Sequence, residues 1–243
     1  PISLKVFLLA LAIIDDLGAI IIIAFFYSAE LQYVYLILML GCFLALIIVN
    51  KFGVKKFLPY LFIGIFLWYF THESGIHSTI SGVLLALTIP HRILDKDFSL
   101  LLKLEHFLHP YVAFGIMPLF AFANAGVSLE NVSMKTLMGP VPLGILCGLF
   151  FGKQIGIFLF SIISIKLKFA QMPNNSNWLN FYGVGVLAGI GFTMSLFVGN
   201  LAFVENTHHI DGVKIGVLSG SLISAIFGYT LLLFTHRTYE SHK

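Results

Sequence analysis

Two adjacent aspartates lie in the middle of the first apolar segment of this chain. Asp15 and Asp16 fall near the centre of a 24-residue run from Leu4 to Tyr27. At 1.5 Å per residue, this run is long enough to cross a hydrocarbon core of roughly 30 Å. An ionised aspartate at that depth costs on the order of 3 kcal/mol on insertion scales. The pair therefore predicts a site that binds protons or cations.

One lysine has an equally unusual position. Lys153 lies near the centre of the apolar span 141–165, too deep for its side chain to reach an interface easily. A lysine and a carboxylate on different helices would relieve each other's desolvation. Neighbouring residues on a helix point about 100° apart, so one pocket seldom receives both aspartates. We therefore favour a contact between Lys153 and Asp15, which leaves Asp16 for an ion; the alternative is a lysine bound to backbone carbonyls for structure alone.

A glycine-rich stretch lies inside another apolar run, 179–200. Gly183, Gly185, Gly189 and Gly191 are followed by the hydroxyls of residues 193 and 195. Unwound backbone inside a membrane is tolerated only where it lines protein or water, and interrupted helices carry substrate sites in secondary transporters. The alternative is close helix packing through small residues.

The composition indicates the class of protein that carries these features. Of the 243 residues, 58% are hydrophobic, 10% are charged and 25 are Phe, with a mean hydropathy of +0.97. We predict an all-α integral membrane protein whose partner is the lipid bilayer. The net charge of +3 forms no basic patch, so we predict no nucleic-acid binding. Cys42 and Cys147 are interpreted as small apolar residues rather than a disulfide or a metal pair.

Eight apolar runs predict a single membrane domain, residues 1–243, with about eight transmembrane helices. They cover residues 4–27, 32–50, 57–71, 75–90, 106–124, 141–165, 179–200 and 213–235. The third and fourth are short, which predicts tilted or incomplete spans.

The loops carry an uneven distribution of basic residues. If they alternate sides and the amino end is inside, eleven lysines and arginines lie on one side, and only Lys135 and Lys214 lie on the other. The positive-inside rule makes the first side cytoplasmic and predicts a cytoplasmic carboxyl terminus. Because the chain begins with Pro1 directly before an apolar run, we expect an N-terminally truncated fragment.

Four elements together resemble the NhaA-type bacterial sodium/proton antiporters. They are AIIDDLGA around Asp15 and Asp16, FANAG at 122–126, the Gly152-Lys153 pair, and GIGFTMS at 189–195. The resemblance extends over essentially the whole chain, which looks like the fifth to twelfth of the family's twelve helices. It implies an inverted-repeat fold in which two interrupted helices cross, with the first repeat largely missing. We expect that such a fragment alone does not transport.

The resemblance also implies a function and roles for individual residues. Asp16 matches the aspartate that binds sodium or lithium and exchanges protons, and Asp15 matches the partner of the intramembrane Lys153. The second interrupted helix would include Gly189, Gly191, Phe192 and Thr193. The protein would export sodium in exchange for protons by alternating access across the bacterial inner membrane. It would be no enzyme and need no cofactor beyond the transported ions.

Several histidines are candidates for a response to pH, because imidazole titrates near neutrality. Glu105, His106 and His109 match a pH-sensing cluster of the family, or simply begin an interfacial helix. His77 matches a histidine linked to pH response, or packs by a hydrogen bond. His208 and His209 belong either to a solvated loop or to an outward element that helps form a homodimer in the family.

Other function classes fit less well. An intramembrane aspartyl protease needs aspartates on two helices, and a prenyltransferase needs a DDxxD motif; neither pattern occurs here. The stronger rival is another ion-coupled carrier, such as a sodium-driven symporter of organic solutes.

Overall fold

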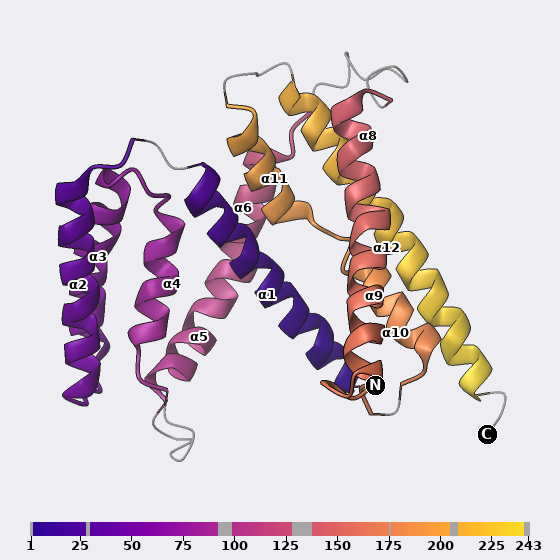
Figure 1. Cartoon of the computed structure of the whole chain (residues 1–243), viewed down its shortest axis with the longest axis horizontal. Helices are drawn as coiled ribbons and strands as arrows, with labels where there is room; N and C mark the ends of the chain where they lie inside the picture. Colours follow the sequence, from indigo (N-terminus) through magenta and orange to yellow (C-terminus); the bar gives the residue numbers. More distant parts are fainter. Residues whose placement is uncertain are drawn as a thin grey trace. The chain divides into compact units, whose positions relative to one another are not determined.

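A computed structural model of the chain describes residues 2–27, 30–91, 99–127, 138–174, 176–204 and 209–240. Every regular element within these ranges is a helix (Figure 1). This confirms the all-helical class that the composition predicted. The chain divides into two compact units, residues 1–17 with 121–243 and residues 18–120.

Most apolar runs form helices of membrane-spanning length. Five helical segments within the described residues are long and apolar enough to cross a bilayer: Ile2–Phe26, Tyr33–Lys51, Leu100–Asn124, Pro140–Lys166 and Ile210–Thr235. A sixth span results if α10 (Trp178–Leu187) and α11 (Phe192–Ala202), which bend by 44°, are counted together. The other two runs form α3 (Phe57–Glu73), with 17 residues, and α4 (Thr79–Thr88), with 10. Both are short, as the sequence predicted.

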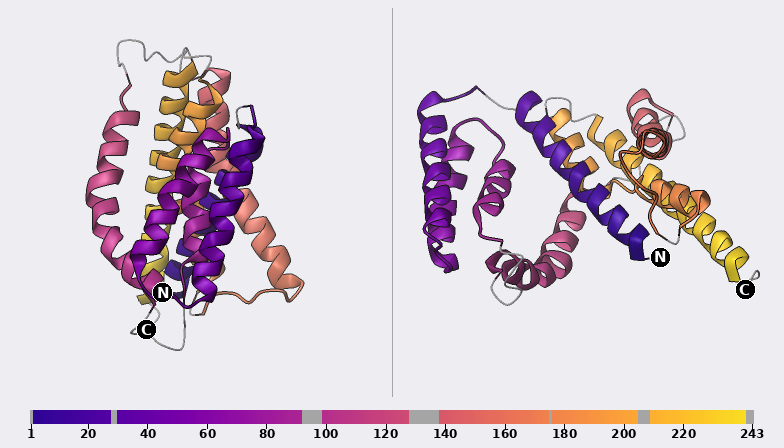
Figure 2. Two further views of the ribbon diagram at one scale, coloured as in Figure 1. Left: turned by 90° about the vertical axis from the view of Figure 1, so that its left-hand side faces the viewer. Right: turned by 60° about the horizontal axis from the view of Figure 1, so that its bottom comes forward.

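The unit of residues 18–120 contains α2 (Tyr33–Lys51), α3, α4 and α5 (Leu100–Tyr111). Figure 2 shows α2 and α3 running side by side. Their contact is built on Leu46, Tyr60 and Leu67, all fully buried. The Asn50 side-chain amide donates to the Thr88 carbonyl and fastens α4 to α2. Ser99 caps α5 by accepting from the Leu102 N–H at 3.3 Å.

The unit of residues 1–17 and 121–243 is organised around one long helix, α12 (Ile210–Glu240). It packs against α8 (Pro140–Cys147), α10 and α11. Leu149, Leu196, Val213 and Val217 form the buried core of this packing. The amino-terminal part of α1 (Ile2–Phe26) belongs to the same unit. Its Phe7 ring packs against Phe181 of α10, with the ring centroids 4.8 Å apart and the ring planes tilted by 42°.

Two π-helical turns interrupt otherwise continuous helices. One, η2 (Val112–Ile116), follows Pro110, which lacks the N–H that a regular α-helix would use there. The other, η4 (Gly148–Gly152), joins α8 to α9 (Lys153–Lys166) and ends directly before Lys153. Such turns are frequent at functional sites. The second turn therefore sets the direction in which Lys153 leaves its helix.

Candidate functional site

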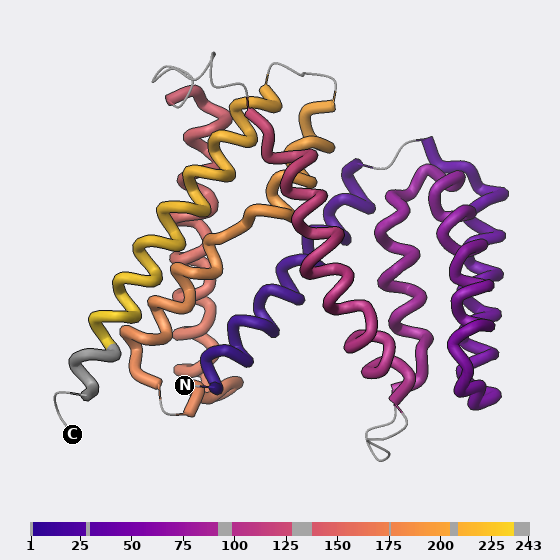
Figure 3. Tube along the Cα trace, turned by 180° about the vertical axis from the view of Figure 1, so that it is seen from behind, coloured from indigo at the N-terminus to yellow at the C-terminus, as the bar shows by residue number. Residues whose placement is uncertain are grey.

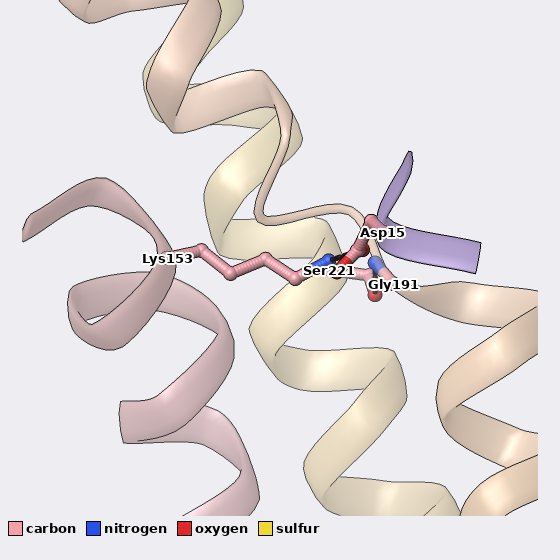
Figure 4. Close-up of polar contacts among 4 residues, drawn as sticks. All are labelled: Asp15, Lys153, Gly191 and Ser221. Carbon is pink, nitrogen blue, oxygen red and sulfur yellow. Dashed lines mark hydrogen bonds and ion pairs between the residues drawn. The ribbon is translucent and has the colours of Figure 1, made fainter. Parts of the chain in front are cut away.

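Asp15 and Lys153 form an ion pair. The Lys153 Nζ lies 2.6 Å from the Asp15 Oδ2 (Figure 4). The Lys153 side chain is 25% exposed and the Asp15 side chain is 53% exposed. At this distance the ammonium donates a charge-assisted hydrogen bond to the carboxylate. The contact that the sequence favoured, between Lys153 and the first of the two aspartates, is present.

Asp16 has no such partner. No hydrogen bond or salt bridge to its carboxylate is present within the described residues. It follows Asp15 in α1, so its side chain leaves the helix about 100° further round. One carboxylate is therefore held by a cation, and the adjacent one keeps its oxygens for another ligand.

The glycine-rich run is interrupted next to this pair. Helix α10 ends at Leu187 and α11 begins at Phe192, so residues 188–191 form a non-helical link (Figure 3). Gly189 and Gly191 lie in the link, whereas Phe192 and Thr193 begin α11. Gly183 and Gly185, which the sequence offered equally as breakers, remain helical and buried in α10.

Close packing explains why the link needs glycine. A Cβ added at Gly189 would lie 2.5 Å from the Ser224 Oγ and 2.7 Å from the Leu149 carbonyl oxygen. No unstrained Cβ makes such a contact with backbone. The interruption and the close packing that the sequence posed as alternatives therefore occur together.

A second polar contact fixes the first half of the interrupted helix. The Tyr182 hydroxyl of α10 donates to the Oε1 of Gln154 at 2.7 Å, and Gln154 is buried directly after Lys153 in α9. The helix that carries the lysine is thus tied to the helix that leads into the link. Sequence reasoning missed this contact, although a glutamine beside a membrane lysine is a signal that could have raised it.

Three candidate pH-responsive residues belong to the unit of residues 18–120. Glu105, His106 and His109 all lie on α5, where the His106 Nδ1 is 2.9 Å from the Leu102 carbonyl oxygen. Within the described residues, no group of three acidic, histidine or cysteine side chains could hold a metal ion. His209 begins the turn that leads into α12, and His208 lies outside the described residues.

His77 occupies the link between α3 and α4. The Thr79 N–H donates to its Nδ1 at 3.5 Å, and the Thr79 Oγ1 is 3.1 Å from the same nitrogen. Burial, and to a lesser degree the neighbouring His72, lower the pKa of the His77 imidazole. The neutral ring, with Nδ1 as an acceptor, is the form that suits this place.

A cavity of about 1110 Å³ opens at the beginning of α1. Its polar lining includes Ser3 and Lys5 of α1 together with Asn174, Asn177 and Asn180. The cavity reaches Leu8 of α1, and Asp15 lies seven residues, or about 10 Å, further along the helix. It therefore does not contain the carboxylate pair.

Comparisons with known proteins point to one family. The family described as Na+/H+ antiporter 1 matches residues 1–232. The chain is 67% identical to the Na(+)/H(+) antiporter NhaA of Pelagibacter ubique over 98% of its own length and 61% of the relative. It is 52% identical to the Na(+)/H(+) antiporter NhaA 2 of Pseudomonas syringae pv. syringae, over 96% of this chain and 59% of the relative. The chain thus spans about three fifths of the length of these curated relatives.

Proposed function

This chain belongs to the Na+/H+ antiporter 1 family, and we propose that it carries the ion site of a sodium/proton antiporter. The observation that supports this most strongly is the pairing of Asp15 with Lys153 while Asp16 lacks a partner. A carboxylate inside a membrane helix, beside a tethered one, is a typical proton and ion site in pumps and transporters. The names of the two relatives, both Na(+)/H(+) antiporters, indicate sodium as the second substrate.

The proposed chemistry is competition at one carboxylate. Asp16 either carries a proton or contributes oxygen ligands to sodium or lithium, because both use the same lone pairs. The Lys153 ammonium binds the Asp15 carboxylate, so Asp15 takes no direct part in this exchange. Binding one proton or one cation at Asp16, but not both, is what couples their movements.

The interrupted helix would supply the rest of the site. Links inside broken membrane helices present backbone groups to ions, and residues 188–191 lie beside the Asp15–Lys153 pair. Alternating access would follow from a change in how these elements pack. Roles for Gly189, Gly191, Phe192 and Thr193 in this step are part of the proposal.

The proposal extends to the membrane placement and the assembly of the protein. The eleven-to-two distribution of basic residues supports a cytoplasmic carboxyl terminus in the inner membrane. A homodimer and a pH response through His77, Glu105, His106 and His109 rest on the family resemblance alone. These remain predictions.

The test is sodium-induced collapse of a proton gradient in everted membrane vesicles. A chimera would join residues 1–243 to the part of the Pelagibacter relative that this chain does not match. Without any organic solute, we expect sodium and lithium, but not choline, to dissipate the gradient. The isolated chain is expected to be silent in this assay. A chimera that responds only when an organic solute is added would instead support the symporter alternative.

A further inference from the structure

We infer that Ser221 of α12 is a positioning residue for the ion site, because it holds the start of α11 beside the Asp15–Lys153 pair. The Gly191 N–H donates to the Ser221 Oγ at 3.3 Å. Ser221 is only 7% exposed. Figure 4 shows Asp15, Lys153, Gly191 and Ser221 gathered in one place, although they come from different elements. This inference rests on the proposed function.

The hydrogen bond matters because of where Gly191 lies. Gly191 directly precedes α11 and has no side chain with which to cap it. The first N–H groups of a helix lack partners within that helix. Ser221 therefore supplies from α12 an acceptor that the link cannot supply itself, and it fixes the position of the α11 amino terminus.

The shape of α12 allows this contact. Small residues recur every four positions on it, at Gly216, Gly220, Ser224 and Gly228. A Cβ added at Gly216 would lie 2.7 Å from the Pro142 carbonyl, and one added at Gly228 would lie 2.6 Å from the Leu187 side chain. Small residues at this spacing let membrane helices approach closely. This row of small residues lets α12 pack closely against α8 near Gly216 and against the end of α10 near Gly228.

Ser224 of α12 packs closely against the link. Its Oγ is fully buried, next to Gly189, and has no hydrogen-bond partner within the described residues. A buried hydroxyl without a partner costs free energy. The neighbouring Ser221 is the residue of α12 that binds the link, through the Gly191 N–H.

The first test measures hydrogen exchange in the full chain, by mass spectrometry of peptides covering residues 187–195. Ser221→Ala is expected to speed exchange in this segment about fivefold, the effect of losing one hydrogen bond of ordinary strength. Ser221→Thr keeps the acceptor and is expected to preserve protection. The control is Ser219→Ala, since the Ser219 hydroxyl donates to carbonyls of its own helix, those of Ile215 and Gly216.

The second test measures transport by the chimera. Ser221→Ala is expected to raise the apparent KM for sodium about fivefold with a smaller change in maximal rate, and Ser221→Thr is expected to restore it. Unchanged exchange and unchanged KM in Ser221→Ala, or equal changes in Ser219→Ala, would overturn the inference. If the unmutated chimera does not transport, the proposed function fails, while the exchange result still decides the role of Ser221.

Discussion

Lys153 and Asp15, 138 residues apart in the chain, meet at 2.6 Å between Nζ and Oδ2. The contact joins α1 to the helix that follows the π-helical turn η4. It gives two adjacent aspartates different surroundings, since the neighbouring Asp16 has no salt bridge within the described residues.

The ion pair should stabilise the fold measurably. Lys153→Met and Asp15→Asn each leave one charge unpaired, and each should lower the free energy of unfolding by about 1–3 kcal/mol, between the values for exposed and buried pairs. The double variant should recover part of this loss. Unfolding in detergent measures the cycle, with the exposed Lys166→Met on the same helix as the control. Strictly additive losses would mean that the two side chains do not interact.

The link between α10 and α11 should not accept a side chain at Gly189. Gly189→Ala places a Cβ against the Ser224 Oγ and the Leu149 carbonyl, and overpacking of this kind costs about 1–3 kcal/mol. Adding Ser224→Ala should not rescue it, because the carbonyl remains. Gly156→Ala is the matched control, since nothing lies within 4 Å of its added Cβ. Equal melting temperatures for Gly189→Ala and Gly156→Ala would refute this account of the link.

His77 should make stability depend on pH. Its pKa is lowered in the folded chain, so the unfolded chain binds more protons below the ordinary value of about 6.5. Stability is therefore full above that value and decreases as the pH falls through this window towards the folded pKa. His77→Gln cannot take up a proton, and its melting temperature should fall less on acidification than that of the unmutated chain. If the melting temperatures of the two proteins fall equally on acidification, His77 does not contribute to the pH dependence of stability.

The contact between α9 and α10 should couple two residues. Tyr182→Phe removes the donor to Gln154 and should cost about 1 kcal/mol, the net worth of an ordinary hydrogen bond. In Gln154→Leu the same tyrosine change should cost much less, because the acceptor is already gone. A double-mutant cycle from thermal unfolding measures the difference, and a coupling energy of zero would contradict the contact.

Much of the site could be predicted from the sequence because charges inside membrane spans are so costly. Asp15, Asp16 and Lys153 stand out on that ground alone, and helix geometry favoured the pairing that the structure shows. The glycine pattern alone placed the interruption within the thirteen residues 183–195, and the family resemblance pointed to Gly189, Gly191, Phe192 and Thr193. The glycine at which the helix is interrupted depends on contacts with other helices. Gly189 lies against Ser224 and a backbone carbonyl, whereas Gly183 lies against flexible leucine side chains.

Other features could not be predicted, because they depend on contacts between distant segments. The π-helical turn before Lys153 has no local marker such as the proline that precedes η2. Ser221 lies in a run of small and apolar residues and gains its partner only when α12 packs on the link. The pattern of apolar runs also did not predict that the chain divides into two compact units.

The central claim is that Asp16 exchanges sodium for protons. The most direct test is uptake of radioactive sodium by proteoliposomes that contain the chimera, driven by an imposed pH gradient. We predict that Asp16→Asn lowers uptake to the level of protein-free liposomes, whereas Glu30→Gln, which removes an exposed carboxylate just after α1, leaves it unchanged. Uptake by Asp16→Asn equal to that of the unmutated chimera would contradict the account.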